Sequence, residues 1–136
     1  MASVLILGAS RGIGLELTRQ YVDQGRPVFA TFRNEPDRIK LRDMGAQTLR
    51  LDIHNPNDLA GLAWQLDGEL LDTIVMNAGV YGPRESHLRA PPDPKAFDEV
   101  MHTNVLGAMR LVPLVAPLLF ETAGTLAFVS SRMGSI

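Results

Sequence analysis

The sequence predicts an α/β protein with a doubly wound parallel sheet. Apolar, strand-like runs at about residues 3–7, 27–32, 46–51, 71–76 and 124–130 alternate with segments of helical periodicity, a pattern typical of parallel strands joined by helices. The first run leads through a glycine-rich turn directly into a helix-like segment. Because no low-complexity linker or internal repeat divides the chain, we expect residues 1–136 to form part of one domain that holds the first five strands.

The turn at residues 8–14 is a candidate phosphate site. The preceding run, Val-Leu-Ile-Leu at 4–7, is typical of a buried parallel strand. Gly8, Gly12 and Gly14 remove the side chains that would keep the backbone from approaching a pyrophosphate. The following helix would direct its free N–H groups and positive dipole end at the same spot. The alternative is that the three glycines only form a turn.

The first helix is predicted to bury one apolar face and to end at a glycine. Ile13, Leu17 and Tyr21 recur four residues apart, which places them on one side of a helix. Gly25 is suited to the left-handed position after a helix end, just before Pro27.

Two further helices are predicted from proline pairs. Asn55-Pro56 and Asp93-Pro94 each combine an N-cap residue with proline at the first helical position. We therefore expect helices to begin near residues 56 and 94. The segment from Tyr81 to Pro92 is rich in proline and polar residues, so we expect a surface loop there, beside the site.

The helix that begins near residue 94 carries an asparagine among apolar residues. A buried amide costs about 1–3 kcal/mol unless its hydrogen bonds are satisfied, so Asn104 is expected to be a structural link or a functional group. Pro113 and Pro117 should kink or end this helix. The predicted face consists of Phe97, Met101, Asn104, Ala108, Leu111 and Val115.

Composition excludes several classes of function. A net charge of −2 provides no field for nucleic acid or anionic lipid. The sequence has no cysteine, and its three histidines, His54, His87 and His102, lack ligand spacing, so we expect no metal site. The amino-terminal apolar run is too short for a signal peptide, and the longest later one is interrupted by a charge and two prolines. We expect a cytoplasmic protein without a membrane span.

Five separated motifs together resemble the short-chain dehydrogenase/reductase family. They are Gly-Ala-Ser-Arg-Gly-Ile-Gly at 8–14, Leu-Asp-Ile at 51–53, Asn-Ala-Gly at 77–79, Thr-Asn-Val-Leu-Gly at 103–107 and the serine pair 130–131. The resemblance covers the whole chain and implies a Rossmann fold. The ending Ser-Ser-x-x-Gly-Ser-Ile is similar to the branch that contains C-factor and sniffer-type carbonyl reductases.

The resemblance assigns roles to residues at the ends of the strands. Ser131 would hydrogen-bond the substrate carbonyl, and Asn104 would anchor a water molecule of a proton relay. The reaction implied is reversible hydride transfer between NADP(H) and a carbonyl or secondary alcohol. The implied cofactor-binding residues are Gly8, Ser10, Arg11, Gly12, Ile13, Gly14, Arg33, Asp52, Ile53, Asn77, Ala78 and Gly79.

Arg33 indicates which nicotinamide cofactor is bound. Domains that bind NAD place an acidic residue about 20 positions after the glycine-rich turn, where it accepts from the ribose hydroxyls. This chain has Arg33 at the end of the second predicted strand, and a guanidinium binds a 2′-phosphate that a carboxylate would repel. With Arg11 nearby, we predict NADP rather than NAD, although Glu35 and Asp37 oppose this choice.

The acid/base pair of the family is absent from these 136 residues. It is a tyrosine with a lysine four residues on, whereas Tyr21 is followed by Gly25 and Tyr81 by Glu85. The lysine matters because a free phenol titrates near pH 10. We expect the chain to be the amino-terminal, cofactor-binding part of a longer reductase that lacks its carboxyl-terminal elements. Alone it should be inactive and should associate through its apolar helix near 94–119, as a homo-oligomer.

Two other functions stay open. Residues 8–12 also fit Gly-x-Ser-x-Gly, the nucleophile turn of serine hydrolases, with Ser10 as nucleophile. No His-Gly-Gly-Gly-like run accompanies it, and the hydrolase interpretation leaves Arg33 unexplained. The second alternative is a non-catalytic NADP-binding scaffold or signalling protein, which the fold alone does not distinguish from an enzyme.

Overall fold

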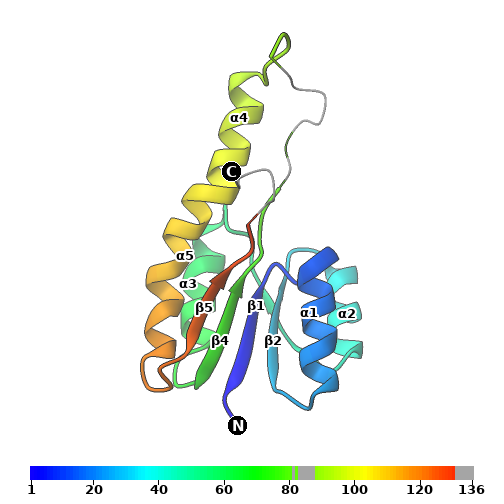
Figure 1. The fold of residues 1–136 in the computed structure, drawn as a ribbon, viewed down its shortest axis with the longest axis vertical. Coiled ribbons are helices and arrows are strands. Elements are labelled where there is room, and N and C mark those ends of the chain that lie inside the picture. Colours follow the sequence, from blue (N-terminus) through cyan, green and yellow to red (C-terminus); the bar gives the residue numbers. More distant parts are fainter. Residues whose placement is uncertain (81, 83–87, 131–136) are drawn as a thin grey trace.

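The computed structural model describes residues 1–80, 82 and 88–130. In this part of the chain five parallel strands form one sheet in the order β3-β2-β1-β4-β5. The chain therefore moves outward from β1 in one direction and then returns to continue in the other, which confirms the predicted doubly wound sheet (Figure 1). The strands are β1 Ser3–Leu7, β2 Val28–Phe32, β3 Gln47–Arg50, β4 Leu71–Met76 and β5 Thr125–Phe128.

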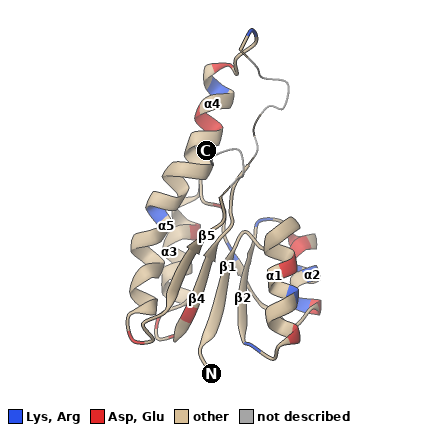
Figure 2. Cartoon of the chain, viewed as in Figure 1, with Lys and Arg blue, Asp and Glu red and all other residues tan. Residues whose placement is uncertain are grey.

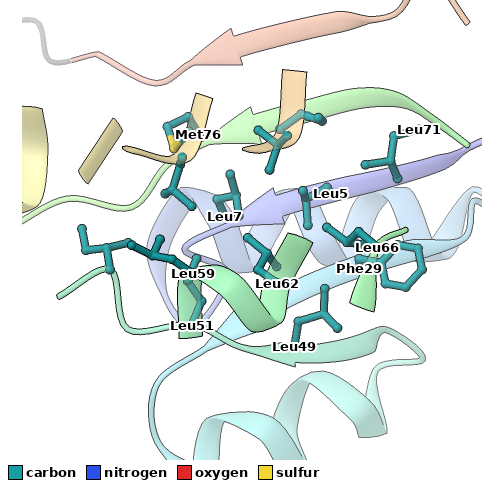
Figure 3. Packing of buried hydrophobic residues seen from close by; sticks show 14 of the residues in the cluster. Leu5, Leu7, Phe29, Leu49, Leu51, Leu59, Leu62, Leu66, Leu71 and Met76 are labelled. Atoms are coloured by element: carbon teal, nitrogen blue, oxygen red, sulfur yellow. The ribbon is translucent and has the colours of Figure 1, made fainter. Parts of the chain in front are cut away.

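Helices cover both faces of the sheet. Helices α1 (Gly12–Asp23) and α2 (Glu35–Asp43) lie on one face, and α3 (Pro56–Gln65) and α5 (Gly107–Val115) lie on the other (Figure 1). All residues of β1 are buried, and alternate side chains enter opposite layers. Leu5 and Leu7 pack with Leu59 and Leu62 of α3 (Figure 3), while Val4 and Ile6 join the cluster under α1 and α2. This continuous burial explains the unbroken apolar run of the first strand.

The strand ends differ slightly from those predicted. The second, third and fifth strands are shorter than expected by one to three residues, but pairing continues past two of them. The N–H of Leu51 donates to the carbonyl of Phe32 at 2.9 Å, and that of Val129 donates to Met76 at 3.0 Å. These bonds hold the first residues after β3 and β5 along the edge of the site.

The predicted apolar face of α1 is confirmed at Leu17 and Tyr21, which are partly buried against the core, but not at Ile13. The helix buries Gly14 and Thr18, whereas Ile13 is 57% exposed. The fully buried positions are instead a glycine and a threonine, which allow the helix to lie close to the sheet, and the Thr18 hydroxyl donates to the Gly14 carbonyl at 2.8 Å. The predicted end is confirmed, since Gly25 has a φ of 77° just after the helix.

Both predicted N-caps are confirmed. The Asn55 side chain accepts from the N–H of Asn57 at 2.9 Å at the start of α3. The Asp93 side chain accepts from the N–H of Ala96 at 2.8 Å at the start of α4 (Pro94–Met101). Half of the predicted surface loop before α4, residues 81 and 83–87, lies outside the described residues.

The long helix from residue 94 is a composite. A π-helical turn, η1 (His102–Leu106), connects α4 to α5, and a 3-10 turn, η2 (Ala116–Leu119), follows α5. Pro113 is accommodated inside α5, while Pro117 coincides with the change to 3-10 geometry. The prediction that these prolines kink or end the helix is therefore confirmed at Pro117, where the α-helix gives way to a 3-10 turn, whereas Pro113 does not end the helix.

The apolar face predicted for this helix is buried only in its second half. Helix α4 extends beyond the sheet (Figure 1), so none of its residues is buried. Phe97 is 53% and Met101 40% exposed. The π turn also inserts a residue into the helical repeat, so that a spacing counted across it changes phase. The buried positions are Gly107, Leu111, Val115 and Leu119.

By length and composition alone, the helical stretch Pro94–Leu119 is long and apolar enough to cross a membrane. One such stretch is weak evidence, because core helices meet the same criterion. The apolar character of the second half of this stretch is explained by burial in the core, where Leu111 and Val115 pack in one cluster with Leu62 and Ile74. Most of its ribbon carries no charged position, whereas charged positions gather on α1 and α2 (Figure 2).

Candidate functional site

A cavity of about 460 Å³ lies at the carboxyl ends of β1, β2 and β4. The direction of strand order reverses between β1 and β4, and open α/β sheets bind ligands at such a point. The described residues that line it are Gly8, Ser10, Arg11, Gly12, Ile13, Thr31, Phe32, Arg33, Asn34, Asp37, Leu51, Ile53, Asn77, Ala78, Gly79, Val80 and Thr103.

Gly8 is held at the centre of the site by two neighbouring strands. Its N–H donates to the Thr31 hydroxyl at 2.9 Å, and its carbonyl accepts from the Asn77 side-chain amide at 3.0 Å. The backbone has a φ of 88°, and an added Cβ would lie 2.7 Å from the backbone of Ala78. Only glycine fits here, so the first motif and the Asn-Ala-Gly motif are physically joined.

Gly12 and Gly14 have different roles. A Cβ on Gly14 would lie 2.0 Å from the Gly8 carbonyl oxygen, so Gly14 permits α1 to pack against the turn. Gly12 lines the cavity, has a φ of 57° and has no atom within 4 Å of an added Cβ, so the space at this position is open. The N-cap residue Arg11 makes no side-chain cap, and the first turn of α1 contains no acidic residue, so the positive helix end stays available to an anion.

Arg11 and Arg33 supply positive charge at the cavity. Both are exposed lining residues, and within the described ranges neither guanidinium has an ion pair or a hydrogen bond. The backbone of Arg33 is fixed, because Arg50 donates to its carbonyl at 3.0 Å while lying 5.3 Å from the ring centroid of Phe32. Two guanidinium groups without partners favour a ligand with phosphate groups.

Of the two carboxylates that counted against NADP, Glu35 lies outside the cavity lining and Asp37 belongs to it. Glu35 accepts from Arg38 at 2.7 Å and from Arg50 at 3.2 Å, and the hydrogen bond from Arg38 lowers the pKa of Glu35 below its ordinary value. Asp37 does line the cavity and lies 3.5 Å from the ammonium of Lys40.

The end of β3 contributes Ile53, while Asp52 lies beside the cavity without lining it. The Asp52 carboxylate accepts from the N–H of His54 at 2.9 Å, and the Asp52 N–H donates to Asp58 at 2.8 Å. The described contacts of Asp52 are therefore those of a turn residue.

The end of β4 is connected to the π-helical turn by Asn104. Asn77, Ala78 and Gly79 line the cavity, and the segment continues to Val80. Val80 donates to Asn104 Oδ1 at 2.8 Å, and Asn104 Nδ2 donates to the Val80 carbonyl at 2.8 Å. Asn104 is exposed rather than buried, because η1 lies above the sheet, but its amide makes one bond as an acceptor and one as a donor. It acts here as a structural link.

Ser131 lies outside the described residues, so the structure does not place it. Among the described residues no group of three or more metal-ligating side chains is found. The sequence analysis missed several lining residues, namely Thr31, Asn34, Val80 and Thr103. Thr31 had a signal, because it is a polar residue in the otherwise apolar strand Val-Phe-Ala-Thr-Phe. Thr103 also had a signal, because it is the first residue of the Thr-Asn-Val-Leu-Gly motif. Asn34 and Val80 lie outside the motifs and had none.

Comparison with known proteins agrees with this geometry. A family model described as short chain dehydrogenase matches residues 2–136. The chain belongs to the short-chain dehydrogenase family. Family membership, as predicted from the motifs, is thus confirmed, while the sniffer-type branch stays a prediction.

Relatives of this short-chain dehydrogenase include L-fucose dehydrogenase from Rattus norvegicus, which is 29% identical over 137 residues. The alignment covers 98% of this chain and 50% of the relative, so the chain spans about half the length of the curated relatives it matches. A carbonyl reductase from Pseudomonas aeruginosa PAO1 in complex with NADP is 30% identical with a TM-score of 0.86, and covers 100% of this chain and 64% of that one. Serine dehydrogenase from Escherichia coli is 27% identical with a TM-score of 0.85, over 98% and 63% of the two chains.

Proposed function

We propose that this short-chain dehydrogenase chain binds NADP(H) in the cavity at the switch point of its sheet, as part of an oxidoreductase. The observation that carries the proposal is a pair of arginines, Arg11 and Arg33, that have no partner among the described residues and lie beside a glycine-rich turn lining the cavity. The NADP complex of the similar carbonyl reductase supports the choice of cofactor.

The residues of the cavity fit a dinucleotide. The open space at Gly12 and the free amino end of α1 suit the pyrophosphate. Ile53 and the cavity-lining residues Ala78 and Gly79 would contact the adenine and ribose side, with Ser10 and Ile13 at the turn itself. Asp52 and Gly14 would act indirectly, through the turn and through helix packing.

Selection of NADP over NAD would come from Arg33 with Arg11. A guanidinium forms paired hydrogen bonds with a phosphate, and the end of β2 is where this class of sheet reads the ribose 2′ position. Glu35 does not oppose this role, since Arg38 and Arg50 engage its carboxylate.

The reaction we propose for the intact protein is hydride transfer between the cofactor and a carbonyl or secondary alcohol. When bound, the cofactor supplies the hydride. Ser131 would hydrogen-bond the substrate carbonyl, and Asn104 would anchor a proton-relay water besides its described bonds to Val80. Because these 136 residues hold no tyrosine followed four residues later by lysine, we propose that they bind cofactor but turn over poorly on their own.

Oligomerisation is proposed through the helix near 94–119. Phe97, Val105 and Met109 are 53%, 43% and 66% exposed, and exposed apolar side chains in one helix favour association. Analytical ultracentrifugation of Met109→Glu should show a smaller particle than the unmodified chain. The single domain and the cytoplasmic location expected from the sequence stay predictions.

The decisive experiment is titration with NADPH and with NADH, followed by thermal stability, because a ligand that binds only the native state raises its stability. We expect the larger shift with NADPH, and a reduced NADPH shift for Arg33→Ala. Arg110→Ala, on the distant α5, is the matched control. No shift with either nucleotide would refute the cofactor proposal, and a larger shift with NADH would refute the role of Arg33.

Two further assays separate the alternatives. A scaffold protein would bind NADPH yet show no carbonyl reduction even when the complete protein is assayed. Labelling of Ser10 by a fluorophosphonate would instead support the hydrolase interpretation, which we do not favour.

A further inference from the structure

Lys40 joins the two segments that form the arginine-lined end of the cavity. It lies on α2, yet its ammonium donates to the carbonyl of Ser10 in the glycine-rich turn at 2.6 Å. The same ammonium lies 3.5 Å from Asp37 Oδ1. Ser10 and Asp37 line the cavity, so one side chain contacts both walls of its charged end.

The carboxylate of Asp37 would disfavour a phosphate ligand if the ammonium of Lys40 did not neutralise it. Among the described lining residues Asp37 is the one carboxylate, and its side chain is 29% exposed. A carboxylate in the first turn of α2 stabilises that helix through its dipole, but it would repel a nearby phosphate. The positive charge of Lys40 offsets it, which leaves Arg11 and Arg33 as the net charge at this end.

We propose that Lys40 is a positioning and specificity-determining residue that makes the cavity selective for a nucleotide with a 2′-phosphate. It does so by neutralising Asp37 and by fixing the Ser10 peptide next to Arg11. This inference rests on the proposed function, because it presumes that the ribose of NADP(H) lies between Arg33 and Arg11. Figure 2 shows basic and acidic positions together along α2, so the effect depends on the specific pair and not on an overall basic helix.

The two contacts of Lys40 have separable consequences. Loss of the bond to Ser10 should loosen the turn and weaken NADPH and NADH alike. Loss of the charge opposite Asp37 should weaken NADPH more, because only NADPH carries the 2′-phosphate. A partly exposed ion pair changes an equilibrium by up to about fivefold, so the ratio of the two dissociation constants should fall by about three- to fivefold.

The test measures the dissociation constants of NADPH and NADH for the full chain and its variants by fluorescence titration at low ionic strength. Lys40→Met should lower the NADPH preference, and Lys40→Arg should retain it. Asp37→Asn added to Lys40→Met should restore the preference, because the uncompensated carboxylate is then gone. Lys95→Met, on the distant α4, is the matched control, since Lys40 and Lys95 are the two lysines of the sequence.

The outcomes distinguish this inference from the proposed function. Equal weakening of both nucleotides in Lys40→Met, or no rescue by Asp37→Asn, would overturn the specificity role while leaving NADP(H) binding intact. Failure of the unmodified chain to bind either nucleotide would overturn the proposed function and this inference with it. The effect should also shrink in 1 M salt, where the Debye length is about 3 Å; an unchanged ratio there would contradict an electrostatic origin.

Discussion

Asn104 and Val80 are joined by two reciprocal hydrogen bonds, each of 2.8 Å. The side-chain amide of Asn104 thus pairs with the backbone of Val80 as a neighbouring strand would. Val80 follows the Asn-Ala-Gly segment that lines the cavity, and Asn104 lies in the π-helical turn. This pairing fixes the cavity wall to the long helix. Glycine at position 79 leaves room for the Asn104 side chain, because a Cβ there would lie only 3.1 Å from Asn104 Oδ1.

Replacement of Asn104 by alanine should loosen this wall. Both bonds would be lost, and since each contributes about 0.5–1.5 kcal/mol, we expect a loss of about 1–2 kcal/mol in the free energy of unfolding and weaker nucleotide binding. Asn104→Asp should retain acceptance from the Val80 N–H and lose less. Urea denaturation and NADPH titration measure the two effects. Asn57→Ala, an exposed asparagine on α3, is the control, and equal losses in both alanine variants would contradict the pairing role.

A second prediction concerns Thr31, which is 3% exposed and accepts from the N–H of Gly8 at 2.9 Å. Thr31→Val keeps the shape of the side chain but removes the acceptor of the part-buried Gly8 N–H, and the loss of such a bond costs about 0.5–1.5 kcal/mol. Thr31→Ser keeps the hydroxyl and should retain the Gly8 bond. Denaturation of the pair gives the difference. If valine were as stable as serine at this position, the hydroxyl would not hold the glycine-rich turn.

Where sequence reasoning succeeded, a local pattern determined the structure. The proline that follows Asn55 and Asp93 marks a helix start through capping alone, and a continuous apolar run marks a strand buried on both faces. These signals need no knowledge of distant residues. The carboxyl ends of parallel strands must then lie along one edge, so most of the candidate site followed from the fold class.

Where it failed, the result depended on contacts between distant segments. The burial of Gly14 and Thr18 in place of Ile13 depends on how closely α1 approaches Gly8. The face of the long helix changes at η1, which forms where Asn104 pairs with Val80. The contact of Lys40 with Ser10 spans 30 residues. No periodicity within a segment contains this information.

A third prediction concerns pH and the exposed surface of α1. Hydrogen bonds from Arg19 and then Gln20 lower the pKa of Glu16 from 4.5 to about 2. Because the pKa is lower in the folded state, Glu16 stabilises the fold above pH 4.5, and this contribution disappears as the pH falls from 4.5 toward 2. Arg19→Ala should raise the pKa of Glu16 toward its ordinary value, as read by an NMR titration, and should flatten the pH dependence of stability in that window. Gln20→Ala should have a smaller effect, and the reverse order would contradict the assigned causes.

The last prediction separates two glycines of the same turn that the sequence treats alike. Gly14→Ala would place a Cβ 2.0 Å from the Gly8 carbonyl oxygen, and such overpacking costs about 1–3 kcal/mol or more, so this variant should be poorly folded. Gly12→Ala meets no atom within 4 Å, but its φ of 57° is left-handed, which costs about 1–2 kcal/mol for a residue with a side chain.

The Gly12→Ala variant should therefore fold, with a modest loss in thermal stability, yet bind NADPH more weakly because its methyl group occupies the space left for the pyrophosphate. Gly61→Ala is the control, since Gly61 lies inside α3 with open space around it. There alanine should stabilise the helix by about 1 kcal/mol without changing nucleotide affinity. Normal NADPH binding by a folded Gly12→Ala chain would mean that the turn does not approach the phosphates of the cofactor.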